Sequence, residues 1–164
     1  MKLLVMSDSH GKIENMLYAV KNTEHDAIVH LGDYVKDVQA LKREVPDCVI
    51  YSVTGNGDSL GSAEREIFMT LDGVKILITH GHDYDVKNGL HLLQIRAKEL
   101  EADLVLYGHT HQSSIINDFG RWFMNPGQMQ MHLYFMPATY GIVTIENGLA
   151  ACTLAHHPTL GKQK

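Results

Sequence analysis

Five short apolar runs in this chain end abruptly in polar residues, and these endings constrain the fold more than any other feature. Each run has the length of a buried strand, and each ending supplies Asp, Asn or His next to a glycine. In an open α/β sheet the carboxyl ends of the strands line one crevice, so residues from distant parts of the chain meet there. The residues concerned are Asp8 and His10, Asp33, Asn56, His80, and His109 with His111. We therefore expect one shared site built from five segments.

The spacing of apolar residues predicts strands that alternate with helices in the first half of the chain. Residues 2–6 form an apolar run, and Ile13, Met16, Leu17 and Val20 then repeat with the period of a helix. The same pattern recurs over residues 26–45. The next expected elements are a third buried strand at 48–53, a helix from about 86 to 100 and a strand at 104–107.

Hairpin signals dominate the other segments. Asp72-Gly73 predicts a tight turn between strands at 66–72 and 74–79. Breaks at 118–120 and 147–148 predict antiparallel pairing among the four last strands, expected at 113–116, 121–124, 140–145 and 149–154. The segment 127–136 alternates polar and apolar residues and is rich in Met, which favours a half-buried strand over an adaptable pocket wall or an oligomer surface.

Length and composition predict one domain over 1–164, with a frayed polar tail at 157–164. Cys48 and Cys152 are isolated, as expected for buried free thiols in a reducing cytoplasm. No apolar run reaches membrane length and no signal peptide is recognised, so we expect a soluble cytoplasmic protein without a membrane partner. A net charge of -5 without a basic cluster argues against binding of bulk nucleic acid.

The residue types at the strand ends are those of a metal site. In a strand, side chains two positions apart point the same way, so Asp8 and His10 can reach one ion. The seven candidate ligands are too many for one zinc ion, but they suit two ions that share a carboxylate, for which Asp33 is the natural bridge. His30 lies inside a buried strand, where we expect a hydrogen-bonded core histidine or a residue that supports a ligand.

At this point the sequence resembles the calcineurin-like metallophosphoesterases. Their motifs occur here in order as Asp8-Ser9-His10, Gly32-Asp33, Gly55-Asn56-Gly57-Asp58, His80 and Gly108-His109-Thr110-His111. The short chain, Thr79-His80-Gly81-His82 and Asn125-Pro126-Gly127 resemble the small prokaryotic phosphodiesterase branch, which is also similar to a retromer subunit.

The resemblance implies a fold and a set of ligands. The fold is α/β, with two mixed β-sheets sandwiched between helices in four layers (αββα). One metal is expected on Asp8, His10, Asp33 and His111, and the other on Asp33, Asn56, His80 and His109. Imidazole and carboxylate suit Mn²⁺, Ni²⁺, Fe²⁺ or Zn²⁺, among which our prediction puts Mn²⁺ first. Relatives are often oligomers, so a homodimer or homotetramer is expected.

The implied activity is hydrolysis of a small or nucleotide-like phosphodiester by in-line attack of a metal-bridging hydroxide. The alternatives are a phosphomonoesterase, a dinucleoside polyphosphate hydrolase and a non-catalytic binding scaffold. Many relatives carry, directly after the Asn, a histidine that protonates the leaving group, whereas this chain has Gly57 there. We therefore expect dependence on good leaving groups, or proton donation by His82 or water. His109, Asp58 and His82 are the predicted catalytic residues, with Asp58 expected to orient a ligand.

Overall fold

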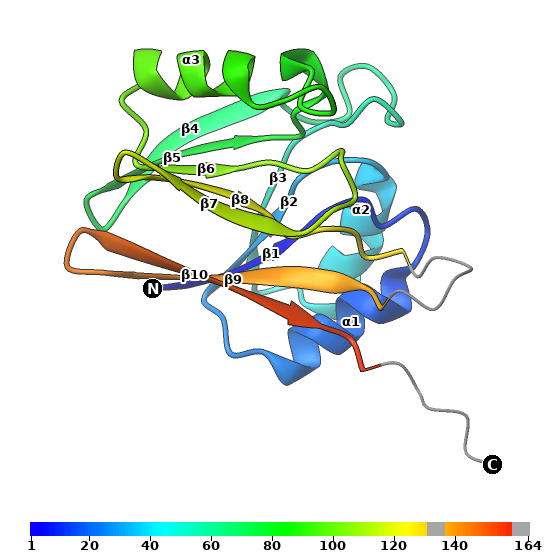
Figure 1. The fold of residues 1–164 in the computed structure, drawn as a ribbon. Helices are drawn as coiled ribbons and strands as arrows, with labels where there is room; N and C mark the ends of the chain where they lie inside the picture. The colour runs from blue at the N-terminus through cyan, green and yellow to red at the C-terminus, as the bar shows by residue number, and fades with distance from the viewer. Residues whose placement is uncertain (131–136, 159–164) are drawn as a thin grey trace.

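Two mixed five-stranded sheets pack face to face in the computed structural model, which describes residues 1–130 and 137–158 (Figure 1). The first sheet has the order β10-β9-β1-β2-β3 and contains β1 (Lys2–Met6), β2 (Ala27–His30), β3 (Val49–Ser52), β9 (Thr139–Glu146) and β10 (Leu149–His156). The second has the order β4-β5-β6-β8-β7 and contains β4 (Glu66–Leu71), β5 (Val74–Thr79), β6 (Leu104–Leu106), β7 (Ser114–Asp118) and β8 (Arg121–Asn125).

Helices cover the outer faces of both sheets. Helices α1 (Ile13–Asn22) and α2 (Val35–Glu44) lie on the first sheet, where Met16, Ala19 and Leu41 pack on Leu4 and Ile28. Helix α3 (His91–Glu99) lies on the second sheet, as Figure 1 shows. A third apolar cluster fills the space between the sheets. The described residues therefore form the four αββα layers that the sequence resemblance implied.

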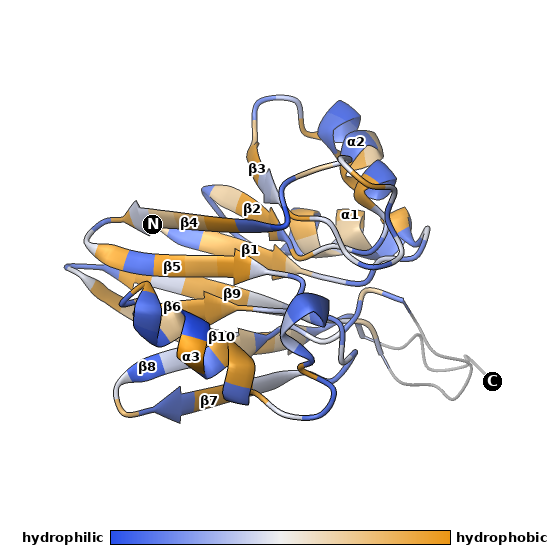
Figure 2. Cartoon of the chain, turned by 90° about the horizontal axis from the view of Figure 1, so that it is seen from above, coloured by the Kyte–Doolittle hydropathy of each residue, from blue (hydrophilic) through white to orange (hydrophobic). Residues whose placement is uncertain are grey.

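The parallel strands place their carboxyl ends at one edge of the molecule. In the first sheet β1 pairs with β2, and β2 with β3, in parallel. In the second sheet β5, β6 and β8 are parallel neighbours. Figure 2 shows that the inner strands are largely hydrophobic and that hydrophilic loops follow β5 and β6 at their arrowheads. The five predicted endings therefore lie at the edge where a shared site can form.

Several predicted elements are confirmed. Strand β1 occupies residues 2–6, and β4 and β5 form the hairpin around Asp72 and Gly73, whose φ values of 45° and 80° suit a two-residue turn. Strands β7 and β8, and β9 and β10, are antiparallel hairpins. No helix within 1–130 or 137–158 is long and apolar enough to cross a membrane.

Two predicted elements are wrong in detail. The helix expected from about 86 begins at His91, because a short 3₁₀ helix, η1 (His82–Tyr84), and Gly89 at φ 134° precede it. Strand β3 is not a buried strand: it lies at the edge of its sheet, and Val49 is 52% exposed. The two cysteines are free, as predicted, but half-buried rather than buried.

Two other expectations concern segments that the structure describes only in part. Residues 127–130 are not in a strand, which corrects the first part of the strand expected over 127–136; residues 131–136 lie outside the described residues. The predicted tail begins at His157, but its backbone N–H donates to the Ala138 carbonyl oxygen and its ring contacts Tyr18. Residues 159–164 also lie outside the described residues.

Candidate metal centre

Most of the predicted ligands have a backbone conformation that residues with side chains rarely adopt. Five of the seven have φ between 44° and 69°, in the left-handed region. Such conformations cost free energy and are concentrated at functional sites, where the surrounding structure holds them in place. The residues are Asp8, His10, Asp33, His109 and His111. The chain therefore turns sharply at each strand end and directs these side chains toward one place.

Four of these residues form a compact cluster. Asp8, His10, Asp33 and His111 each contribute one atom to a group in which all atoms lie within 4.8 Å of one another. The two aspartates are buried and the two histidines half-buried. These are the four residues that the family resemblance implied for the first of two metals. Their nitrogen and carboxylate oxygen atoms are a donor set typical of divalent transition metals.

The carboxylate of Asp8 is fixed through one oxygen, while its other oxygen faces His111. Its Oδ2 accepts hydrogen bonds from the Ser7 hydroxyl at 2.5 Å and from the His109 backbone N–H at 3.2 Å. Its Oδ1 lies 3.1 Å from Nε2 of His111. Burial acts to raise the pKa of Asp8, but His111, His80 and Ser7 outweigh it, so the pKa lies below its usual value. In turn, the Asp8 carboxylate raises the pKa of His111. Asp8 is therefore ionised and positioned as a ligand.

His80 provides a test of whether a cation fits this site. Its Nδ1 lies 2.7 Å from the Leu31 carbonyl oxygen, which can only accept, so Nδ1 carries the hydrogen and Nε2 presents a lone pair. This Nε2 is buried, lies 3.5 Å from Oδ1 of Asp33, and receives no hydrogen bond from the described residues. Two acceptors that face each other in a buried site are unfavourable, and a metal ion bound by both would relieve this repulsion. The arrangement therefore fits a metal.

Asp33 lies between the two halves of the predicted centre. Its Oδ1 faces His80 and accepts a hydrogen bond from the Gly57 backbone N–H at 2.8 Å, while its Oδ2 lies 3.8 Å from Nε2 of His10. That His10 nitrogen is also buried and has no hydrogen bond from the described residues. Gly55 packs so closely that a Cβ atom there would lie 2.1 Å from Oδ1 of Asp33. Only glycine allows this approach.

The second half of the predicted ligand set is more open. The His109 ring lies 5.0 Å from the His80 ring, centroid to centroid. Burial, together with the charges of His80 and Lys87, lowers the pKa of His109 to about 4, which leaves its nitrogen lone pair available at neutral pH. Asn56 is exposed in the loop after β3. His80 therefore faces one oxygen of Asp33 while His10 faces the other, and His109 lies beside His80. Among the described residues, His80 and His109 are not part of the compact cluster.

The two other predicted catalytic residues differ in position. Asp58 uses both carboxylate oxygens to accept backbone N–H groups, from Val35 at 2.7 Å and from Gly55 at 2.9 Å. It therefore holds the loop that carries Asn56. His82 lies on η1, with its ring centroid 5.2 Å from that of His80. Burial lowers the pKa of His82 below its usual value.

Two supporting residues are not evident from the sequence. Asn125, at the end of β8, donates from Nδ2 to the Gly108 carbonyl oxygen at 2.9 Å and to Oγ1 of Thr110 at 3.0 Å, and it thereby fixes the loop that carries His109 and His111. Asp37 on α2 accepts hydrogen bonds from the Ser9 hydroxyl at 2.8 Å and from the Gly11 N–H at 2.7 Å. In the sequence, Asn125 stood out through the Asn125-Pro126-Gly127 resemblance and its position after an apolar run, but neither feature gave its hydrogen-bond partners.

His30 connects this second support to the core. It is buried, its Nε2 lies 3.2 Å from Oγ of Ser9, and its Nδ1 accepts from the Gly32 N–H at 3.3 Å. Because the Ser9 hydroxyl donates to Asp37, Nε2 of His30 carries the hydrogen. Burial lowers the pKa of His30 to about 4. His30 is therefore a neutral core histidine that also supports the loop carrying Asp8 and His10.

Comparison with known proteins finds similar sequences over most of this chain. A family model described as the calcineurin-like phosphoesterase superfamily domain matches residues 1–148. A Bacillus subtilis protein named "Probable metallophosphoesterase YsnB" is 34% identical over 153 residues, covering 92% of this chain and 88% of that protein. A Methanocaldococcus jannaschii protein named a phosphodiesterase is 29% identical over 163 residues, covering 89% of this chain and 94% of that protein.

Solved structures show the same fold. A Streptococcus pneumoniae crystal structure, described as a predicted phosphoesterase, has a TM-score of 0.78 at 28% identity and covers 94% of this chain and 88% of that one. A Vps29 variant from Entamoeba histolytica has a TM-score of 0.77 at 19% identity, with 96% and 100% coverage. The second likeness concerns the fold alone.

The variant Asp8→Asn is expected to weaken metal binding by about 100-fold while the fold persists. The amide oxygen can still accept from Ser7 and His109, but the amide nitrogen has no lone pair for a metal. Calorimetric titration of the metal-free protein with Mn²⁺ measures the affinity, and circular dichroism measures the fold. The exposed Asp47→Asn variant is the matched control. Unfolding of Asp8→Asn, or unchanged affinity, would contradict the assigned role.

The variant His30→Gln is expected to flatten the pH dependence of stability between pH 6.5 and about 4. Folded His30 takes up a proton only below its pKa of about 4, whereas the unfolded chain does so below 6.5. The unfolded state therefore binds more protons in this window, and stability falls as the pH falls, by on the order of 3 kcal/mol from this residue. Urea unfolding of the metal-free protein measures the slope, with exposed His91→Gln as the control. A slope equal to that of the wild type would exclude this contribution.

Proposed function

The chain belongs to the calcineurin-like phosphoesterase superfamily, and we propose that it is a metal-dependent phosphodiesterase acting on small or nucleotide-like phosphodiesters. The observation that carries the proposal is the pair of imidazole nitrogens, of His10 and His80, that flank the Asp33 carboxylate without hydrogen bonds from the described residues. Such an arrangement suits cations on both sides of one carboxylate. The named phosphodiesterase of M. jannaschii supports the same reaction class.

The proposed centre binds two divalent ions. Asp8, His10, Asp33 and His111 would hold one ion, while Asn56, His80 and His109 would hold the other together with Asp33. When bound, the ions would stabilise negative charge on the phosphoryl oxygens and lower the pKa of the attacking water. We propose Mn²⁺ as the first choice, with Ni²⁺, Fe²⁺ and Zn²⁺ also suited to this donor set.

The proposed reaction is hydrolysis of one ester bond. A bond forms between the water oxygen and phosphorus, the bond to the leaving oxygen breaks, one proton moves to the leaving group, and a phosphomonoester remains. The protein residues orient the reacting groups: Asp33 and His80 are held by Gly57 and Leu31, and His109 is fixed through Asn125. Because these contacts already exist, little reorganisation is needed during the reaction.

Charge near the site favours a diester over a monoester. A monoester has one more negative charge than a diester and is usually bound by additional basic side chains. Arg65 lies near the site, but its guanidinium is paired with Asp83. Lys87 acts on His109 through its charge, but it is a single exposed amine and not a bidentate clamp. A phosphomonoesterase or a dinucleoside polyphosphate hydrolase is therefore the second choice. The intact ligand set argues against a binding scaffold.

Diester and monoester turnover tests the proposal directly. Metal-free protein refilled with Mn²⁺ is expected to hydrolyse bis(4-nitrophenyl) phosphate with a kcat/KM about tenfold or more above that for 4-nitrophenyl phosphate, and Ni²⁺ and Zn²⁺ extend the comparison. Asp33→Asn is expected to lose about 100-fold or more in both reactions, which controls for contaminating phosphatases. Faster monoester turnover would overturn the proposed substrate class. Absence of turnover with every metal would instead support the scaffold.

His82 is the proposed proton donor to poor leaving groups, since Gly57 cannot fill that role. Because the pKa of His82 lies below its usual value, only the minor imidazolium form can donate, and this contribution is expected to increase as the pH falls. The variant His82→Gln is expected to reduce kcat about 100-fold for diphenyl phosphate, whose phenolate needs a proton, and to change bis(4-nitrophenyl) phosphate turnover by less than about threefold. His91→Gln, an exposed histidine on α3, is the control. An equal effect of His82→Gln on both substrates, or no effect, would remove His82 as the proton donor.

A further inference from the structure

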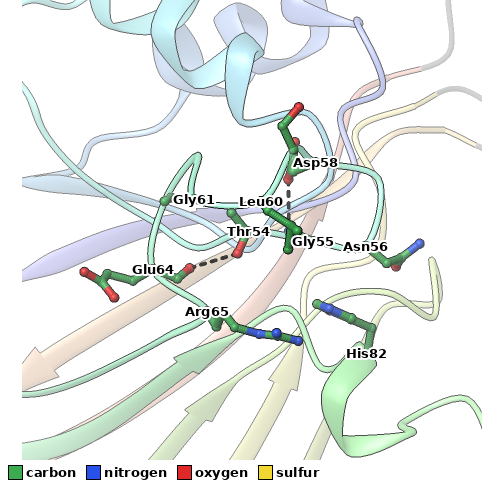
Figure 3. Close-up of a pocket in the computed structure, with 11 residues that line it drawn as sticks. Thr54, Gly55, Asn56, Asp58, Leu60, Gly61, Glu64, Arg65 and His82 are labelled. Atoms are coloured by element: carbon green, nitrogen blue, oxygen red, sulfur yellow. Dashed lines mark hydrogen bonds between the residues drawn. The ribbon is translucent and has the colours of Figure 1, made fainter.

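A pocket of about 460 Å³ opens beside the proposed metal centre (Figure 3). It is formed mainly by the segment from Thr54 to Arg65, between β3 and β4, and His82 closes it from η1. Asn56, a proposed metal ligand, is part of its wall. The volume lies in the range of small-molecule sites. A group attached to a phosphoryl centre near Asn56 can therefore extend into this pocket.

The segment that forms the pocket is fixed at both ends. Thr54 donates from its backbone N–H and from its hydroxyl to the Glu64 carbonyl oxygen, at 2.8 and 3.2 Å, so the start and the end of the loop are joined. Asp58 binds the Gly55 N–H within the loop. Figure 3 shows the Thr54–Glu64 bond and the Glu64 carboxylate directed away from the pocket. The loop thereby sets the position of Arg65 relative to Asn56.

Arg65 presents a fixed plane rather than a free positive charge. Its Nε donates to Oδ2 of Asp83 at 3.0 Å, and its Nη2 donates to Oδ1, so the pair is bidentate. This geometry holds the guanidinium plane, and the carboxylate compensates its charge. In Figure 3 the side chains of Arg65 and His82 point toward each other on one side of the pocket. Arg65 is exposed, so one face of the guanidinium remains free for a ligand.

The rest of the wall carries little charge for binding a second phosphate. Both oxygens of Asp58 are used by backbone N–H groups, from Val35 and Gly55. Ala63 and Gly61 provide a small apolar surface, and the Leu60 side chain is 98% exposed at its rim. Planar guanidinium groups stack on aromatic rings, and exposed apolar side chains add contact area. These features suit a flat organic group.

We propose that this pocket binds an ester group of the phosphodiester, that the group is an aromatic ring or a nucleobase, and that it stacks on Arg65. The segment 54–65 then determines which diesters the protein accepts. The inference rests on the proposed function, because it takes the phosphoryl group to lie at the metal centre.

Binding of two phosphinates tests the pocket separately from catalysis. Diphenylphosphinate and dimethylphosphinate carry the same single negative charge and contain no ester bond, so they cannot be hydrolysed. Calorimetry on the Mn²⁺-loaded protein is expected to give a Kd about tenfold lower for the diphenyl compound. The wild-type preference is thus a ratio of about ten between the two Kd values. Two variants are expected to reduce this ratio to a value between about one and three: Arg65→Lys, which keeps the charge and removes the planar group, and Ala63→Phe, which fills the pocket. Both should leave dimethylphosphinate affinity within about twofold.

Arg43→Lys, an exposed arginine on α2, is the matched control and should retain the tenfold ratio. Equal Kd values for the two compounds in the wild type, or an equal loss for both compounds in the two pocket variants, would overturn the inference. Turnover of bis(4-nitrophenyl) phosphate by the same preparations tests the proposed function. If the protein hydrolyses the diester but binds both phosphinates equally, the proposed pocket is wrong and the proposed function stands. If it prefers diphenylphosphinate but hydrolyses no diester, the proposed phosphodiesterase function is wrong, and with it the role of the pocket in selecting diesters.

Discussion

The arrangement of the proposed site depends on one buried carboxylate, that of Asp33, and on the groups that face it. The imidazole nitrogens of His10 and His80 lie 3.8 and 3.5 Å from its two oxygens, and neither nitrogen receives a hydrogen bond from the described residues. Burying polar atoms without hydrogen-bond partners in this way costs free energy unless a cation compensates it. The left-handed backbone at five ligands adds to the cost. A chain selected for stability alone would not place these groups together, and metal binding gives the arrangement a physical reason.

This unfavourable arrangement persists because polar side chains hold several of the loops that carry the proposed ligands. Asp37 on α2 binds the loop after β1, Asp58 binds the loop after β3, and Asn125 at the end of β8 binds the loop after β6. Residues from the first sheet and its helix thus fix one part of the site, and residues from the second sheet fix another. The geometry of the site therefore depends on how the two sheets pack together through the apolar core between them.

The sequence predicts those parts of the site that depend on local pattern. Short apolar runs followed by Asp, Asn or His gave the strand ends, and the parallel order of β1, β2 and β3 brought them together. It does not predict the roles of Asp37 and Asn125. Both side chains act by hydrogen-bonding a loop that is distant in the sequence, and the sequence does not show which loop packs against them. Periodicity also placed the start of α3 too early, since it cannot detect that Gly89 adopts φ 134°. Likewise, β3 is an edge strand because of its place in the strand order, and the amino-acid composition of a strand does not reveal that order.

The two halves of the proposed centre differ in compactness and exposure, and this difference links the metal centre to substrate choice. Asp8, His10, Asp33 and His111 are compact and largely enclosed, whereas Asn56 is exposed on the segment that also forms the pocket. Thr54 and Asp58 fix this segment at its base, so Asn56 and Arg65 occupy related positions. A change in the length of the segment would move a proposed ligand and the pocket wall together. Substitution of the Arg65 side chain leaves Asn56 in place, and the protein can therefore vary the group it recognises while the proposed metal ligands stay where they are.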